Sequence, residues 1–413
     1  MSTCKTQLSV EKEERRAATS KEQAYPKMAM TAFQFHHCRP FLPSSTKSQP
    51  SASPRVSCMA SHLSAKCRRD YTSVMIVPTG VGASIGGFAG DALPVARALS
   101  SVVDCLITHP NVLNAAMLYW PMQNVLYVEG YALDRFAEGS WALHPVHRNK
   151  VGLVLDNGIE EELRIRHLQA ADATRASLGL PVVEYVVTDT PLEVAKWVDP
   201  KSGQSTGRIK HPDSLLRAVQ TLIDRSQVNA IAVVARFPDD DLDNVDDYRQ
   251  GMGIDVLAGV EAVISHLVVK EFQIPCAHAP ATRPLPMTLS LCPKSAAEES
   301  STDWIHFLAV CACWAKQSTT IFDACGGDGA LAFARSKQNK PLIITVEENE
   351  TVLNSTPDKL GINTVMVANY WEAIGVIAAH KAGIDPQSLR RNRIGNIPCA
   401  SYAPTNGFSL SSV

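Results

Sequence analysis

Short apolar runs alternate with segments of helical periodicity along most of the chain from residue 74 onward. Runs rich in Val, Ile and Leu predict buried strands at residues 74–77, 105–108, 125–128, 151–155, 182–187, 230–234, 320–322, 342–346 and 364–367. Apolar residues recur with helical spacing at residues 93–103, 132–138, 159–178, 212–225, 257–271, 305–315 and 371–382. This alternation predicts an α/β fold with a mostly parallel, Rossmann-like layered sheet and helices on both faces.

Three stretches between these elements are interpreted separately. Pro191 is expected to open a further helix at its first turn, and residues 201–207 (KSGQSTG) are expected to form a polar loop. Residues 275–286 are punctuated by prolines and predict a loop that serves as a domain boundary or a lid near 275–300. The α/β domain should cover residues 73–389, followed by a loosely ordered basic tail over 390–413.

The first 72 residues lack this alternation and are expected to be disordered. Residues 28–69 contain six Lys and Arg residues, no Asp or Glu, and many Ser and Thr residues. This is the composition of an organellar transit peptide, and residues 56–58 (VSC) resemble a chloroplast processing site. We favour import into the chloroplast stroma over a disordered cytosolic tail. Four Glu residues within the first 27 break the pattern, which leaves the start open between Met1, Met28 and Met30.

Composition narrows the class of protein. With 413 residues, 45% of them hydrophobic, the chain can bury a large core, and we expect a soluble protein. A net charge of −2 implies no basic face, so nucleic acid is not an expected partner. No apolar run is long enough to cross a bilayer. The 11 cysteines contain no C-x-x-C pair, which argues against structural zinc and a secreted disulfide framework. Oligomerisation is left open.

The strand predicted at residues 74–77 leads into a glycine-rich turn. Glycine lets backbone N–H groups surround an anion, and the N-terminus of the following helix favours negative charge. The spacing matches neither the dinucleotide fingerprint nor a Walker loop. We therefore expect phosphate or carboxylate binding, and keep dinucleotide binding and a purely structural turn as alternatives. The candidate ligand-binding residues are Thr79, Gly80, Gly82, Gly86, Gly87 and Gly90.

A second glycine turn, residues 321–330 (IFDACGGDGA), again lies between a short predicted strand and a helix. Here Cys325 precedes Gly326 and Gly327, two further candidate ligand-binding residues. A thiol at a helix N-terminus has a lowered pKa, which suits a nucleophile. The alternative, which the general behaviour of free cysteines favours, is that Cys325 is a small buried hydrophobic residue.

Polar side chains follow several predicted strands, at the position where parallel sheets bind ligands. His109, Asn111 and Asn114 follow the strand at 105–108, and His109 is a candidate base near neutral pH. Asp156 and Glu347 follow two other strands and are candidate acid–base residues.

One acidic run raises the question of a metal. Asp239 begins a run of six Asp residues that ends at residue 247, directly after the best-defined strand. Carboxylate oxygens suit Mg²⁺, although the spacing is not that of an EF-hand. Such a run is more often a solvated loop, so Asp239 is a weak candidate metal ligand.

Several motifs, in this order, resemble one family: VPTGVGASIGGFAGDA, THPNVLNAA, LYVEGYALDRF, GVEAVISHL with PCAHAPA, and ACGG with VEEN. On these residues the chain resembles DUF3326, a family of unknown function from cyanobacteria and plant plastids, over residues 74–389. The resemblance implies a plastid protein and implies no activity. Residues 296–324 depart from the family pattern. Because this divergent segment directly precedes Cys325, the resemblance does not support a site around Cys325 in this chain.

These observations predict a chloroplast protein that binds a small anionic metabolite at the first glycine turn and the polar strand ends around it. The leading hypothesis is an enzyme, in which the candidates for the chemistry are His109, Asn111, Asp156, Cys325 and Glu347, and whether the protein is catalytic is left open. Whether Mg²⁺ or another cofactor takes part is left open. The alternative is a non-catalytic ligand sensor or assembly factor of the plastid. An enzyme should bring at least two of the titratable candidates within reach of one small ligand beside the turn.

Overall fold

The computed structural model describes residues 70–77, 92–113, 122–146, 148–239, 254–283, 289–293, 319–321, 342–347, 364–391 and 394–397. Residues 1–69 of the expected transit peptide lie outside the described residues, while Thr72 already belongs to a strand, so the disordered segment predicted to end at residue 72 ends earlier. Both glycine turns and Asn114 also lie outside the described residues, that is, Thr79, Gly80, Gly82, Gly86, Gly87, Gly90, Cys325, Gly326 and Gly327. Predictions on these residues therefore stay predictions.

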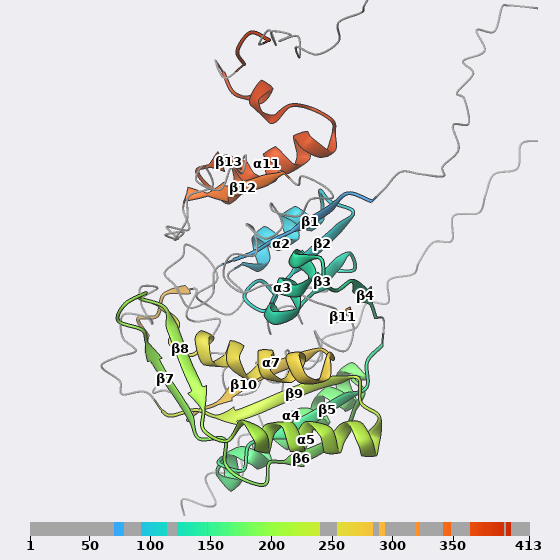
Figure 1. The fold of residues 1–413 in the computed structure, drawn as a ribbon, viewed down its shortest axis with the longest axis vertical. Helices are drawn as coiled ribbons and strands as arrows, with labels where there is room; N and C mark the ends of the chain where they lie inside the picture. Colours follow the sequence, from blue (N-terminus) through green and yellow to red (C-terminus); the bar gives the residue numbers. More distant parts are fainter. Residues whose placement is uncertain are drawn as a thin grey trace, which may run out of the picture. The chain divides into compact units, whose positions relative to one another are not determined.

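The first sheet contains three parallel strands in the order β1 (Thr72–Val74), β2 (Cys105–Thr108) and β3 (Val125–Tyr127). Two helices accompany it (Figure 1): α2 (Leu93–Ser100) leads into β2, and α3 (Gly130–Glu138) follows β3. Val74 pairs with Ile107, and Thr108 pairs with Tyr127, so all three strands end at one edge. Strand β1 ends three residues earlier than the apolar run predicts.

The second sheet contains four parallel strands in the order β10 (Cys276–Ala281), β9 (Ala230–Arg236), β5 (Val151–Leu155) and β6 (Val182–Val187). Its connections include α4 (Glu161–Leu178), α5 (Pro212–Ser226) and α7 (Ala258–Phe272). The sequence predicts β5 and β6 to the residue and the helices to within two residues, because their apolar patterns are long and regular.

Side chains of the second sheet alternate between two hydrophobic clusters. One cluster joins Leu153 and Ala232 of the strands to Ala170 of α4. The other joins Val154 of β5 to Leu222 of α5, and it also includes residues of α7. In β5 and β9 both sets of strand side chains are buried, which explains why these two strands are continuously apolar in the sequence.

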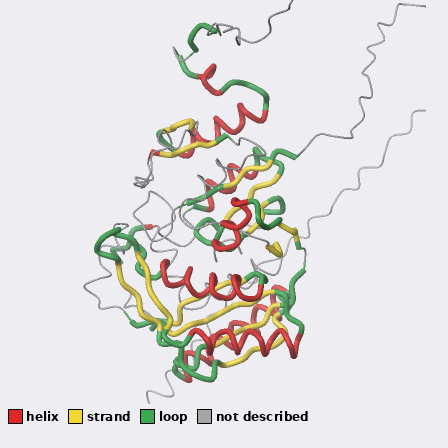
Figure 2. The backbone as a smooth tube through the Cα atoms, in the orientation of Figure 1, coloured by secondary structure: helices red, strands yellow, loops and turns green. Residues whose placement is uncertain are grey.

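Residues 194–209 form an antiparallel hairpin where the sequence predicts a helix after Pro191, and the polar loop predicted over 201–207 is shorter, because its last residues belong to the second strand (Figure 2). Strand β7 (Val194–Val198) pairs with β8 (Ser205–Ile209). The hairpin packs closely on the start of α7, because a Cβ atom on Gly259 would lie 2.2 Å from the Ser205 carbonyl oxygen. The Ser205 hydroxyl accepts a hydrogen bond from the Gly259 N–H at 3.1 Å. Contact with a distant helix thus favours the strands over the local helical pattern.

Residues 276–281 form β10, which corrects the predicted loop over 275–286. Each residue from Cys276 to Ala281 pairs with β9. Pro280 is compatible with the strand because β10 lies at the edge of the described sheet, where prolines are tolerated. The prolines therefore punctuate an edge strand there, and residues 284–288 lie outside the described residues.

The remaining elements are two short strand pairs and a helix. Strands β4 (Leu143–Pro145) and β11 (Thr319–Ile321) pair antiparallel, while β12 (Ile343–Val346) and β13 (Thr364–Val367) pair parallel. Helix α11 (Tyr370–Lys381) is capped by the Asn369 side chain, and a short 3-10 helix, η5 (Pro386–Leu389), follows it. Lys381 binds Asp104 at 2.7 Å, which ties α11 to the start of β2.

The described residues confirm a mixed α/β protein with parallel sheets. Two antiparallel pairs are additional to the prediction. Among the described residues, no helix is both long enough and apolar enough to span a bilayer.

Candidate functional site

His109 lies at the carboxyl edge of the first sheet, directly after β2, and its side chain is buried. Its Nε2 accepts a hydrogen bond from the Val77 N–H at 2.9 Å. Asn111 donates from Nδ2 to the Val77 carbonyl oxygen at 3.4 Å. Burial lowers the pKa of His109 to about 4, so the ring is neutral at pH 7 and carries its proton on Nδ1. His109 and Asn111 thus hold the backbone that enters the first glycine turn.

Glu129 lies at the same edge, two residues after β3, and its side chain is completely buried. It caps α3, since its Oε2 accepts a hydrogen bond from the Ala132 N–H at 3.4 Å. Its Oε1 lies 2.5 Å from Nδ1 of His266 and 3.1 Å from the Ser265 hydroxyl, both on α7. A buried carboxylate therefore joins the first sheet to a helix of the second.

The His266 side chain remains about one-third exposed, unlike the carboxylate that orients it. Its ring packs against the first residue of α3, Gly130, where a Cβ atom would lie only 2.8 Å from Cε1 of His266. Only glycine permits this close approach without displacing the ring. Because Nδ1 faces Glu129, Nε2 is the ring nitrogen left to face another molecule.

Charge adjusts the proton affinity of His266. Burial lowers the pKa of its imidazole, but the charge and hydrogen bond of Glu129, joined by the charge of Asp134 when that carboxyl is ionised, outweigh burial, so the pKa rises above its usual value. A pKa near the working pH suits general acid–base catalysis. The arrangement of a buried carboxylate and an oriented, partly exposed imidazole can accept or donate a proton at Nε2.

Aromatic and cationic side chains of α3 flank this pair. The Tyr131 ring lies 6.3 Å from the His266 ring and 5.9 Å from the Trp141 ring, measured between centroids. The Arg135 guanidinium lies 5.3 Å from the Tyr131 centroid, and its Nε donates to the Tyr131 hydroxyl at 3.2 Å. Tyr131 is therefore fixed beside the imidazole.

Asp156 follows β5, where strand order in the second sheet reverses. The chain passes from β5 to β6 on one side and then to β9 on the other, and ligands commonly bind at such a point. However, Asp156 accepts hydrogen bonds from the backbone N–H groups of Gly158, Leu192 and Arg236, at 2.9, 2.9 and 3.0 Å. Its buried carboxylate ties three segments of backbone together.

Arg236 connects Asp239 to Asp156: its backbone N–H binds Asp156 and its guanidinium binds Asp239. The Arg236 guanidinium binds Asp239 at 2.7 Å and Glu160 at 2.8 Å, and the Arg283 N–H donates to Asp239 at 2.9 Å. Arg236 holds the pKa of the Asp239 carboxyl below its usual value. In the described part of the chain, no three His, Cys, Asp or Glu side chains are arranged to hold a metal ion. The metal role of Asp239 stays a weak prediction.

The predicted site residues therefore form separate groups. His109 and Asn111 meet on Val77, and Asp156 and Asp239 meet on Arg236. Glu347 is exposed directly after β12, in a different strand pair. Sequence reasoning missed Glu129 and His266, although both lie in motifs that carry the family resemblance. The sequence did contain a signal for Glu129. A charged residue that directly follows an apolar strand and precedes a glycine lies where a buried carboxylate needs a specific partner.

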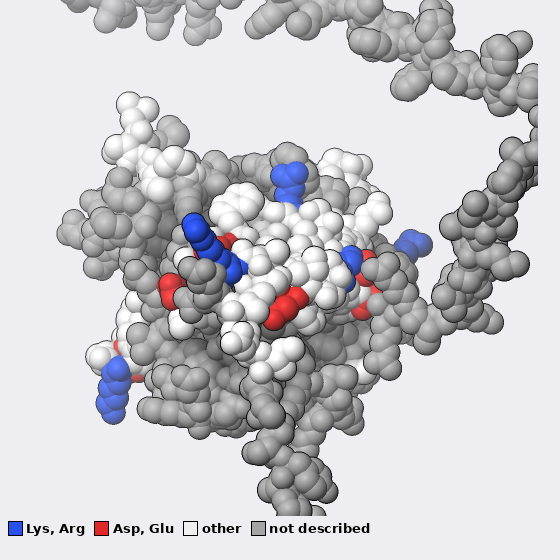
Figure 3. Space-filling model, turned by 90° about the horizontal axis from the view of Figure 1, so that it is seen from above, with Lys and Arg blue, Asp and Glu red and all other residues white. Residues whose placement is uncertain are grey.

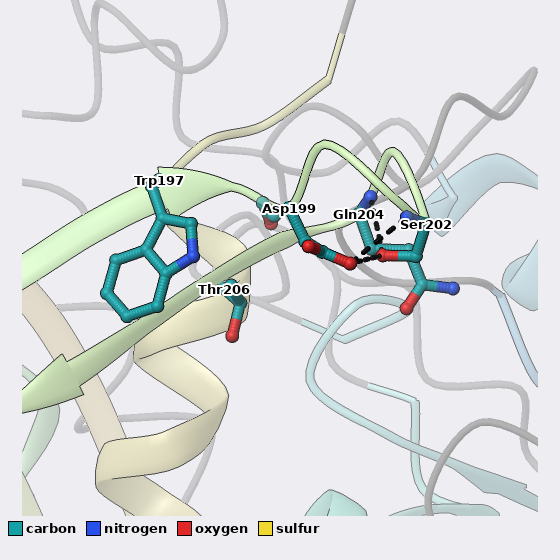
Figure 4. A pocket seen from close by; sticks show the side chains of 6 residues that line it. Trp197, Asp199, Ser202, Gln204 and Thr206 are labelled. Atoms are coloured by element: carbon teal, nitrogen blue, oxygen red, sulfur yellow. Dashed lines mark hydrogen bonds between the residues drawn. The ribbon is translucent and has the colours of Figure 1, made fainter.

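A shallow pocket of about 400 Å³ lies on the β7–β8 hairpin (Figure 4). Asp199 accepts hydrogen bonds from the Ser202 N–H and hydroxyl, at 3.0 and 2.6 Å, so its carboxylate stabilises the hairpin turn. Trp197 lies apart from this turn and is partly exposed. Because the Asp199 carboxylate is used by hydrogen bonds within the turn, this pocket is not the candidate functional site. On the face drawn in Figure 3, the described charged side chains are scattered rather than gathered into one patch.

Comparison with known proteins identifies relatives of this chain. The family model described as "Protein of unknown function (DUF3326)" matches residues 72–316 and 312–390. An uncharacterized lipoprotein of Synechococcus sp. is 50% identical over 342 residues, which cover 78% of this chain and 94% of the relative. No solved structure matches the chain.

Proposed function

The chain belongs to the DUF3326 family, and from this premise we propose that it is an enzyme that binds a small anionic metabolite at the carboxyl edge of the first sheet. In this proposal, His266 performs general acid–base chemistry and Glu129 orients it. The observation that carries the proposal is the 2.5 Å contact between a fully buried carboxylate and a partly exposed imidazole.

The acid–base assignment follows from what a buried Glu129 requires. An ionised carboxylate is costly to bury unless it is paired, and His266 and Ser265 supply the pairing. A carboxylate on Nδ1 fixes the orientation of the ring and stabilises the imidazolium that forms when Nε2 takes up a proton. A purely structural ion pair has no need to leave one ring edge exposed.

The anion-binding assignment combines sequence and structure. His109 and Asn111 fix Val77, and the glycines predicted to surround an anion follow it in the chain. Glu129 lies at the same edge one strand away, because β2 and β3 are neighbours. Imidazolium formation at His266 would add positive charge for an anionic ligand. The glycine turn and the Glu129–His266 pair would then bind two parts of one molecule.

We further propose Rossmann-like layering, with helices on both faces of the second sheet. Alternating burial supports it, because Leu153 clusters with α4 residues while Val154 clusters with α5 residues. Import into the chloroplast stroma is also proposed, supported by the transit-like composition of residues 28–69 and by the cyanobacterial relative.

A non-catalytic ligand sensor or assembly factor is the second candidate function. It is favoured by one observation, the full use of Asp156 in backbone hydrogen bonds and of Asp239 in ion pairs. A sensor would use the first sheet's edge for binding and would keep its ligand unchanged.

The test is thermal unfolding of the full chain against nucleotides, phosphorylated metabolites and carboxylates, each with and without Mg²⁺. A ligand at 100 times its Kd should stabilise the protein by about 2.7 kcal/mol, a shift of a few degrees in Tm. Gly82→Val should abolish the shift, and His266→Asn should reduce it. Conversion of the stabilising ligand by the wild type but not by His266→Asn indicates an enzyme. Binding without conversion indicates the sensor, and silence across the panel contradicts the proposed ligand class.

A further inference from the structure

Asp134 is a second carboxyl group beside the Glu129–His266 pair. It lies on α3 one helical turn after Gly130, and residues four apart share a face of a helix. That face carries the glycine against which the His266 ring packs. Asp134 is therefore placed on the α7-facing side of α3, next to the imidazole.

The Asp134 side chain is buried with one oxygen unsatisfied. Only 8% of the residue is exposed, and among the described residues no hydrogen-bond donor reaches its Oδ1. A buried polar atom without a partner costs about 1–3 kcal/mol, so such an atom calls for an explanation. A proton on the carboxyl, or a ligand hydrogen bond, would supply the missing interaction.

The surrounding charges favour the protonated form of Asp134. Burial raises the pKa of its carboxyl to about 8, against the opposing charge of His266. The charges of Glu129 and Glu138 raise it further, and that of Arg135 lowers it. Asp134 is thus largely neutral at pH 7, so it can donate a hydrogen bond or a proton.

We propose that Asp134 is the second proton-transfer residue of this site, and that the substrate is a small anionic carbonyl compound. This inference rests on the proposed acid–base function. His266 Nε2 takes a proton from the carbon next to the carbonyl, and the electron pair of that C–H bond forms a carbon–carbon double bond. The carbonyl π electrons move to oxygen, which takes the Asp134 proton. The product is the enol, and proton return from His266 to Asp134 restores the site without any oxidant or reductant.

A ligand-free titration tests the proton on Asp134. In the full chain with labelled histidine, the NMR signal of His266, identified by its absence in His266→Asn, should show two inflections, because two interacting groups titrate together. The inflection near pH 8 should disappear in Asp134→Asn and remain in Asp172→Asn, which removes an exposed carboxylate on α4. A single inflection in the wild type overturns the proposal, even where Asp134→Asn fails to fold.

Solvent exchange tests the substrate class and the donor role. Pyruvate, 2-oxoglutarate and dihydroxyacetone phosphate are incubated with the full chain in D₂O, and loss of their C–H signals is followed. Exchange should fall at least 100-fold in both His266→Asn and Asp134→Asn and stay unchanged in Asp172→Asn, at an exposed position on α4. Loss in His266→Asn alone overturns the Asp134 role and leaves the proposed function intact. Binding without exchange overturns the carbonyl substrate, whereas neither binding nor exchange overturns both proposals.

Discussion

Gly130 lies directly against the imidazole of His266, so close that a Cβ atom would come within 2.8 Å of the ring carbon Cε1. The first residue of α3 thereby determines where a side chain of α7 can lie. Because Glu129 precedes Gly130, one short segment supplies both the carboxylate that binds Nδ1 and the surface that supports the ring.

Gly130→Ala should displace His266 and lengthen its contact with Glu129. The methyl group overpacks the α3–α7 contact, which we expect to destabilise the protein by about 1–3 kcal/mol. Thermal unfolding measures the loss, and histidine NMR follows the ring. The matched control is Gly375→Ala in α11, where a Cβ atom would meet nothing within 4 Å and alanine should be neutral or slightly stabilising. Equal effects of the two substitutions would contradict the steric role of Gly130.

Glu129→Gln should lower the pKa of His266. Burial alone lowers this pKa, and the Glu129 charge is the largest effect that raises it. In the wild type, the raised pKa stabilises the folded state fully below pH 6.5, and this stabilisation is lost as pH rises through the folded-state pKa. The glutamine variant should lose this pH dependence, measured as the free energy of unfolding between pH 5 and 9. An unchanged His266 titration in the variant would contradict this electrostatic role of Glu129.

Local pattern predicts the long elements of this fold but not its hairpin. Strand β5 and helix α5 are regular in the sequence because each buries one continuous apolar set. Residues 194–198 show no long regular apolar pattern. They form strand β7 because β8 pairs with them and because Gly259 allows α7 to approach the hairpin. Gly259 lies 54 residues after Ser205, its hydrogen-bond partner in the hairpin, so no local window of sequence contains both.

The candidate site shows the same limit. The sequence indicates that polar residues gather at strand ends, and His109 and Asp156 do lie there. It does not indicate which of them are already saturated by backbone N–H groups, as Asp156 is. Glu129 and His266 lie 137 residues apart, and only the packing of α3 on α7 brings them together.

His109→Phe should weaken the fold and change its response to acid. Phenylalanine cannot accept the hydrogen bond from Val77 N–H, and an unpaired buried N–H costs about 1–3 kcal/mol. The wild-type ring has a folded-state pKa of about 4, so between pH 4 and 6.5 the unfolded state binds more protons and stability rises with pH. The variant should lose this part of the slope in urea titrations. His144→Phe, at an exposed position, should leave the stability at pH 7 unchanged.

Asp156→Asn separates a structural role of this residue from the catalytic one predicted by sequence. The carboxylate accepts backbone hydrogen bonds on both oxygens, whereas an asparagine must turn an NH₂ group toward at least one of the same N–H donors. We expect a loss of about 3 kcal/mol in the free energy of unfolding, since hydrogen bonds to charged groups are stronger than neutral ones. Chemical denaturation at pH 7 measures it. Asp172→Asn, at an exposed ion pair on α4, should cost less than about 1 kcal/mol. Full stability of Asp156→Asn together with lost substrate conversion would instead establish Asp156 as a catalytic residue and move the reaction to the second sheet.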